Sequence, residues 1–141
     1  MTTILAHIRV HPGTEVRFEE LARELYAATH GRESEVRRYE YWRGAEPGSY
    51  YTLLAFSDYP AFLAHQTSTH HEDAGPELSR IIESIRLEWV DPIQGASVLP
   101  ASESAPLPDD ADERTVRYAK AIPPAIASWW QHPRSERALR R

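Results

Sequence analysis

The chain has 141 residues, 41% of them hydrophobic, with a formal net charge of −5 at pH 7 and no cysteine. This length predicts one domain with an appendage, and the lack of cysteine excludes disulfides, thiolate nucleophiles and cysteine-based zinc sites. The acidic balance argues against nucleic acid or a membrane surface as a partner, and no apolar run approaches the roughly 20 residues of a membrane helix. Because the N-terminus also lacks a signal-peptide pattern, we expect a cytoplasmic protein.

The first strand and the first helix follow from apolar spacing. Apolar residues alternate over Ile4–Val10, which is typical of a strand with one buried face. A helix is expected to begin after Thr14, acting as its N-cap, and to run to about Thr29. Gly31 is expected to lie just past its end, where a left-handed residue commonly terminates a helix.

The second half of the periodic region predicts two strands, a helix and a final strand. Residues 36–43 and 50–56 are rich in β-formers and are joined by the turn sequence AEPGS, which predicts a hairpin. A second helix, capped by Asp58, carries three histidines and is expected to break near residues 73–76, because glycine and proline interrupt it. Residues 85–90 are the last predicted strand.

The order β-α-β-β-α-β predicts an α+β, ferredoxin-like domain over residues 1–92. Two helices cover one face of such a sheet, so the other face needs cover, and two sheets facing each other in a homodimer would supply it. Residues 93–113 are rich in proline, serine and acid and predict a linker. Residues 114–141 are basic, contain Trp129–Trp130, and predict a C-terminal arm that docks on the domain, docks on a partner subunit or stays disordered.

The stretch AHQTSTHHED places His65, His70 and His71 within seven residues. On an unbroken helix His65 and His70 would diverge by about 140°, which disfavours a shared metal ion unless the helix breaks between them. Acid–base chemistry suits an imidazole better, since it titrates near neutrality. The alternative is a structural role, with His65 buried against a backbone carbonyl and His70 and His71 solvated.

One stretch, RYEYWRGAEPGSYYTLLAFSDYPAFLAHQTSTHHE, resembles the antibiotic biosynthesis monooxygenase family of dimeric α/β barrels. The matching positions are Arg38, Tyr39, Glu40, Phe56, Asp58, Ala61, His65, Ser68 and His70. The resemblance covers residues 4–92 and implies a dimer with a site between sheet and helices in each subunit. Members of the family oxygenate anthrones or quinols with O2 and no cofactor, degrade haem, or isomerise small ketones, and fold alone does not choose among these.

The resemblance disfavours haem degradation. Members with that activity carry Asn, Trp and a haem-ligating His at positions that hold Ala6, Phe56 and Gly75 in this chain. Phe56 keeps an aromatic wall but lacks an indole N–H donor.

The first hypothesis is therefore a monooxygenase without cofactor or metal that acts on a small electron-rich aromatic substrate and O2. His65 would deprotonate the substrate, and His70 would protonate a peroxide intermediate. The expected substrate-binding residues are Trp42, Thr52, Phe56 and Phe62. Two alternatives remain: an isomerase or cyclase that uses the same histidines without O2, and a non-catalytic small-ligand-binding dimer whose C-terminal arm engages a partner.

Overall fold

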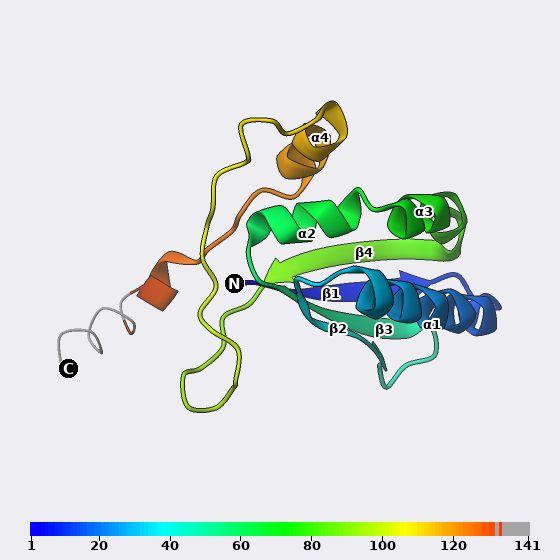
Figure 1. Cartoon of the computed structure of the whole chain (residues 1–141). Helices are drawn as coiled ribbons and strands as arrows, with labels where there is room; N and C mark the ends of the chain where they lie inside the picture. Colours follow the sequence, from blue (N-terminus) through cyan, green and yellow to red (C-terminus); the bar gives the residue numbers. More distant parts are fainter. Residues whose placement is uncertain (132, 134–141) are drawn as a thin grey trace.

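The computed structural model describes residues 1–131 and 133 and shows a four-stranded antiparallel sheet with helices on one face (Figure 1). The strand order is β2-β3-β1-β4. The elements are β1 (Thr2–Val10), α1 (Glu15–Arg32), β2 (Val36–Arg43), β3 (Ser49–Phe56), α2 (Tyr59–Gln66), α3 (Thr69–Ile81), β4 (Ile82–Trp89) and α4 (Glu113–Ala121). The predicted ferredoxin-like α+β fold is confirmed, with one helix more than expected in its second half.

The core lies between the helix-facing side of the sheet and α1, α2 and α3. The alternation predicted for β1 is confirmed, since its even-numbered residues from Ile4 to Val10 are all buried. This central strand pairs antiparallel with β3 on one side and β4 on the other. Phe18 and Phe62 bring aromatic rings from α1 and α2 down onto the same face. Burial of this face is the main apolar contribution to stability.

The end of α1 differs from the prediction. The helix begins after Thr14 as expected, but the Thr14 hydroxyl donates to the His11 carbonyl and makes no capping bond. The helix also continues through Gly31, so the predicted terminating role of this glycine is wrong. Instead Glu33 ends the helix in an extended conformation, with its N–H donating to the Thr29 carbonyl at 3.0 Å. This places the Glu33 side chain at the end of α1, where it faces α2 and α3.

The predicted second helix is two helices, and the predicted break near residues 73–76 is wrong. Pro76 lies inside α3, while the break falls at Thr67 and Ser68. The Thr67 hydroxyl donates to the Leu63 carbonyl at 3.1 Å, and the Ser68 hydroxyl accepts from the N–H of His71 and caps α3. Such side-chain bonds compete with the helical ladder and favour an end and a new start.

β4 begins at Ile82, three residues before the prediction, because α3 passes into it without a loop. The segment after β4 then returns along the end of the sheet (Figure 1). Ser102 is fully buried there and its hydroxyl donates to the Val90 carbonyl at 2.6 Å. The N–H of Glu103 donates to the Met1 carbonyl at 2.9 Å. The region predicted as a linker is thus bonded to the domain.

The C-terminal arm docks on its own domain, on the outer side of α2 (Figure 1). Asp112 caps α4 by accepting from the Thr115 N–H, and the helix ends before the proline pair. The hydroxyl of buried Tyr59 donates to the Ile122 carbonyl at 2.6 Å. The Tyr118 hydroxyl donates to Glu72 at the same distance. Residues 132 and 134–141, which complete the predicted basic arm, lie outside the described residues.

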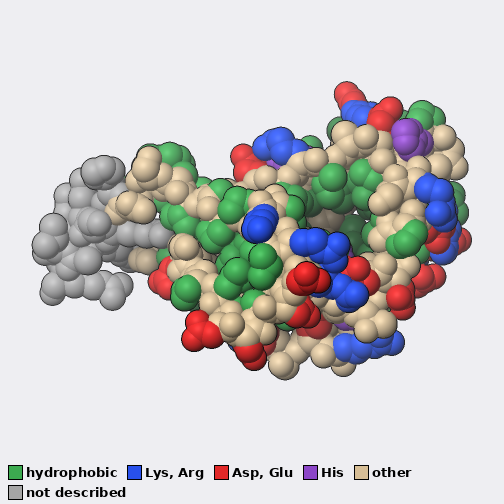
Figure 2. All heavy atoms as spheres, turned by 90° about the horizontal axis from the view of Figure 1, so that it is seen from above, with side chains coloured by type: hydrophobic (Ala, Val, Ile, Leu, Met, Phe, Trp, Pro, Cys, Tyr) green, Lys and Arg blue, Asp and Glu red, His purple; other side chains and the backbone are tan. Residues whose placement is uncertain are grey.

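Seen from the side of α4, acidic and basic side chains are interspersed, and hydrophobic side chains border a hollow (Figure 2). No helix in the described part of the chain is long and apolar enough to cross a membrane.

Candidate active site

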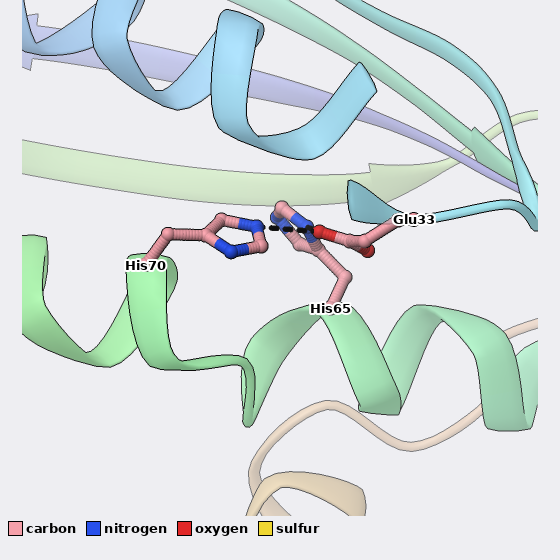
Figure 3. Close-up of side chains that lie close together, drawn as sticks. All are labelled: Glu33, His65 and His70. Carbon is pink, nitrogen blue, oxygen red and sulfur yellow. Dashed lines mark hydrogen bonds and ion pairs between the residues drawn. The ribbon is translucent and has the colours of Figure 1, made fainter. Parts of the chain in front are cut away.

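Three side chains from different helices meet at one carboxylate oxygen (Figure 3). Oε2 of Glu33 lies 2.8 Å from Nδ1 of His65 and 2.6 Å from Nε2 of His70. The His65 side chain is 1% exposed and those of the other two residues are also largely buried. A carboxylate is only an acceptor when ionised, so both imidazoles donate to it.

The local structure explains why these residues meet. Glu33 ends α1, His65 lies in the last turn of α2, and His70 lies in the first turn of α3. The Ser68 hydroxyl donates to the His65 carbonyl at 2.7 Å and lies 3.2 Å from Nε2 of His70. The break between α2 and α3 therefore turns two histidines, which an unbroken helix would separate, toward the same acid.

The cluster favours an ionised Glu33. Burial raises the pKa of its carboxyl, but the hydrogen bonds and charge of His65 and then those of His70 outweigh burial, and the net pKa is lowered. With Nδ1 of His65 donating to this carboxylate, the ring's Nε2 carries the free lone pair of the neutral imidazole. Nε2 is buried and has no hydrogen-bond partner among the described residues.

His65 also lines a cavity of about 110 Å³ between the sheet and the helices. Its polar wall consists of Tyr39, Tyr41, Thr52, His65, Gln66 and His71. Its apolar wall consists of Ile4, Ala6, Ile8, Phe18, Leu25, Leu54, Phe62, Leu78, Ile82, Ile85 and Leu87. Ile85 is 54% exposed, so the cavity reaches the surface beside β4. An apolar cavity with a few convergent polar atoms is the usual form of a small-molecule site.

A larger open groove of about 760 Å³ lies between α1 and β2, away from His65. Arg43, Glu19 and Tyr50 form a bonded network in it. Hydrogen bonds from Arg43 and Tyr50 lower the pKa of Glu19 to about 2. These groups satisfy one another, so the smaller cavity is the better candidate for chemistry.

The structure distributes the predicted site residues over three places. Thr52 and Phe62 line the cavity together with His65, and Phe56 packs against the His65 ring with centroids 5.1 Å apart. Trp42 borders the groove at the edge strand β2 and is 59% exposed. In the strand register it lies opposite Tyr51, on the face of the sheet away from the helices. His70 contacts the Glu33 carboxylate and does not line the cavity.

Two residues of the site escaped the sequence analysis. Glu33 is 32 positions from His65 and lies beyond the predicted end of its helix, so no spacing pattern connected the two. His71 was expected to be solvated, which is wrong: its Nδ1 is buried, and the ring lines the cavity 5.1 Å from the His65 ring, centroid to centroid. The displaced helix break caused the second error, because it turned His71 inward.

Glu33, His65 and His70 offer one carboxylate oxygen and two imidazole nitrogens within 4.8 Å of one another. Two imidazoles and a carboxylate form a donor set that can bind a divalent transition metal. In this structure, however, one carboxylate oxygen satisfies both N–H donors, and a metal would require both nitrogens to lose those protons. That the protein binds no metal stays a prediction. Its argument, an unbroken helix that separates His65 from His70, does not hold, because the helix breaks between these two residues.

His71 predicts a measurable pH dependence of stability. Burial, followed by the charge of His65, lowers its pKa to about 4, and the other charged neighbours include Glu72 and His70. Tyr118 of the arm packs against the same ring. The imidazole of His71 has its ordinary pKa of 6.5 in the unfolded chain, so the unfolded chain binds a proton there as the pH falls below 6.5. In the folded protein the same imidazole stays neutral until about pH 4. The free energy of unfolding should therefore fall across this window, by at most about 3 kcal/mol from this residue.

Urea unfolding at pH 7.5 and pH 4.5 measures this loss in the wild type and in His71→Asn. We expect a smaller loss in the variant, whose side chain does not titrate. Equal losses would show that His71 is not held neutral by the fold.

Comparison with known proteins gives a consistent result. Residues 1–76, more than half of the chain, match the antibiotic biosynthesis monooxygenase family. A search of curated proteins found no match. Among solved structures, a candidate antibiotic biosynthesis monooxygenase from Caulobacter crescentus is 21% identical, with a TM-score of 0.62 over 66% of this chain and 90% of that one.

Two further structures extend the likeness. Rv0793 from Mycobacterium tuberculosis is 16% identical, with a TM-score of 0.61 over 68% of this chain and 98% of that one. A candidate antibiotic biosynthesis monooxygenase from Bacteroides thetaiotaomicron is 15% identical, with a TM-score of 0.63 over 74% and 95%. At these identities the structures establish the fold, while the sequence match over residues 1–76 establishes the family. The chain belongs to the antibiotic biosynthesis monooxygenase family.

Proposed function

We propose that this protein is a cofactor-independent monooxygenase that deprotonates a small electron-rich aromatic substrate with His65 and lets the anion react with O2. Family membership supports a monooxygenase-like role. The observation that carries the finer proposal is the buried Glu33–His65 pair: Nε2 of His65 has no hydrogen-bond partner among the described residues, and His65 lines a largely apolar cavity.

Glu33 gives His65 the properties of a general base. It holds Nδ1 protonated, so that Nε2 is the basic atom, and its negative charge stabilises the imidazolium that forms when the substrate loses a proton. The apolar walls leave the resulting phenolate with little water around it. A phenolate in such a site is a better electron donor to O2 than a solvated one.

The oxidation needs no electron source beyond the substrate. For a hydroquinol, one electron passes from the phenolate to O2, and the two radicals combine at a ring carbon to give a hydroperoxide. The O–O bond then breaks with loss of water, one oxygen atom stays on the ring, and the ring is left as a hydroxyquinone. The balance is quinol plus O2 to hydroxyquinone plus water, with four electrons supplied by the substrate.

His70 acts in this proposal as a positioning residue. It donates to the same oxygen of Glu33 as His65 does and does not line the cavity, so its contribution passes through the carboxylate. Protonation of the peroxide is then the task of the imidazolium of His65, which already holds the proton taken from the substrate.

The proposal keeps two further predictions. The sheet face opposite the helices carries Tyr51, 37% exposed, and Trp42, which suits the packing of two sheets in a homodimer. A cytoplasmic location stays part of the proposal.

The cavity is much smaller than a haem, which supports the exclusion of haem degradation.

Proton transfer without O2, as in an isomerase, is the second candidate, because the Glu33–His65 pair serves it equally well. An oxygen electrode separates the two. Protein treated with a chelator and assayed with one-ring quinols should consume one O2 for each molecule of substrate. Substrate conversion without O2 uptake would overturn the monooxygenase and support the isomerase.

A further inference from the structure

One side chain of the C-terminal arm reaches the surroundings of the proposed base. Tyr118 lies on α4, which packs on the outer side of α2 (Figure 1). Its ring meets the ring of His71 edge to face, with the centroids 6.3 Å apart, and its hydroxyl donates to Oε1 of Glu72 at 2.6 Å. Tyr118 thus contacts two successive residues in the first turn of α3.

The arm holds Tyr118 in place through a bond of its own. The hydroxyl of Tyr59 on α2 donates to the Ile122 carbonyl at 2.6 Å, about one helical turn beyond Tyr118, and Ile122 packs against the core. Burial, followed by the bond to Glu72, raises the pKa of Tyr118 to about 12, so its hydroxyl stays a donor at neutral pH. The arm is therefore fixed to the domain where it meets His71.

His71 in turn contacts the proposed base. The rings of His71 and His65 lie 5.1 Å apart, centroid to centroid, and both residues line the cavity. Nδ1 of His71 is buried, while the residue as a whole is half-buried. A row of three rings, from Tyr118 through His71 to His65, therefore runs from the arm to the cavity.

A neutral His71 is the favourable neighbour for a general base. When His65 takes a proton it becomes positively charged, and a second positive charge on the adjacent ring would oppose that step. Burial, followed by the charge of His65, keeps the pKa of His71 low. The groups that act on His71 or on the tyrosine packed against it are His65 on α2, His70 and Glu72 on α3, and Tyr118, Arg114 and Arg117 on α4. Removal of the Tyr118 ring would open His71 to water and weaken the burial that keeps it neutral.

The arm lies outside the family match, which ends at residue 76. The Glu33–His65 pair belongs to the matched residues, whereas α4 begins at Glu113. The contact between Tyr118 and His71 is therefore supplied by the C-terminal segment of this chain, and family membership does not predict it.

We propose that Tyr118 is a positioning residue of the active site: from the docked arm it holds the His71 ring against His65 and limits its contact with water, so that His65 alone takes up a proton during the reaction. This inference rests on the proposed function for the role of His65. The position that Tyr118 gives to His71 does not depend on the reaction and can be measured without it.

Titration of the imidazoles by nuclear magnetic resonance between pH 8 and pH 4.5 tests this position, with the His71 signals assigned by their loss in His71→Asn. In the wild type we expect His71 to stay neutral above about pH 5. In Tyr118→Ala its midpoint should rise to between about 5.5 and 6.5, toward the value of an exposed imidazole. Tyr118→Phe keeps the ring but loses the bond to Glu72, and its midpoint should stay within about half a pH unit of the wild type.

The reaction provides a second readout. Relative to the wild type, kcat of Tyr118→Ala with a one-ring quinol should be nearly unchanged at pH 8 and at least about fourfold lower at pH 5, where its His71 is charged. A purely structural role of Tyr118 would lower kcat at both pH values. Trp129→Ala is the matched control, because Trp129 lies on the same arm, is 70% exposed and packs against Trp130. It should change neither the titration nor kcat.

An unchanged His71 midpoint in folded Tyr118→Ala would overturn the inference, and so would an equal rise in Tyr118→Ala and Trp129→Ala. Circular dichroism checks the fold, and Tyr118→Val, which removes the ring but fills more of its space, replaces Tyr118→Ala if that variant does not fold. A shifted midpoint with the same kcat ratio of variant to wild type at pH 5 and pH 8 would overturn the link to the reaction. If the wild type takes up no O2, the proposed function fails, and the titration still decides whether Tyr118 holds His71.

Discussion

Replacing His65 by asparagine should lower kcat with a one-ring quinol by a factor on the order of 10²–10⁴, the usual contribution of a general base. The amide nitrogen of asparagine lies near the position of Nδ1, so this variant can still donate to Glu33 and keep the helix ends together. What it lacks is Nε2, the atom assigned to proton abstraction. Initial rates of O2 uptake at saturating quinol measure the change.

The matched control is His11→Ala. His11 lies in the exposed turn after β1, away from the cavity, and its replacement should leave the rate unchanged. A His65→Asn protein that is folded and retains more than about a tenth of the wild-type kcat would remove His65 from the role of base.

The second large effect is expected from Glu33→Gln. The amide has the shape of the carboxylate but no charge, so it no longer stabilises an imidazolium at His65. We expect kcat to fall by about 10²- to 10⁴-fold, because replacing the carboxylate partner of a catalytic imidazole by its amide costs up to about 10⁴-fold. We also expect a loss of about 1–3 kcal/mol in the free energy of unfolding, because two buried N–H donors lose a charged acceptor.

The stability loss in Glu33→Gln has a definite pH dependence. Since the folded protein lowers the pKa of the Glu33 carboxyl, this group stabilises the fold above its unfolded pKa, and the stabilisation disappears as the pH falls through the folded value. The difference in unfolding free energy between wild type and variant should therefore be full at neutral pH and shrink in acid. Denaturant unfolding at pH 7 and at pH 3 measures it.

Glu35→Gln is the matched control for this variant. Glu35 is exposed two residues away and bonds only at the surface, to Ser57 and Arg37. Its replacement should change neither kcat nor the pH dependence of stability. Equal effects of the two variants would show that Glu33 has no special relation to the histidines.

The fold was predictable because apolar periodicity determines which face of a strand or helix is buried. Ile4, Ala6 and Ile8 alternate in the sequence and are buried together in β1. The helix break was predicted in the wrong place because proline and glycine received more weight than the side-chain hydrogen bonds of Thr67 and Ser68. Those bonds depend on local geometry that residue type alone does not specify.

The site was predictable only in part for the same reason. His65 was identified from residue type and from family resemblance. Glu33 and His71 can be assigned to the site only when the helix ends are known. Glu33 comes from the end of α1, far from His65 in the sequence, and His71 faces the interior because the helix breaks before it. A pair that meets across the fold leaves no spacing signal in one sequence.

The most direct test of the central claim is the fate of labelled oxygen. Chelator-treated protein is incubated with a one-ring quinol under ¹⁸O2, and the product is analysed by mass spectrometry, with a parallel reaction in labelled water to correct for exchange. The proposal predicts one ¹⁸O atom in the product and the other in water. A product that forms without label would contradict it and would reassign the Glu33–His65 pair to proton transfer alone.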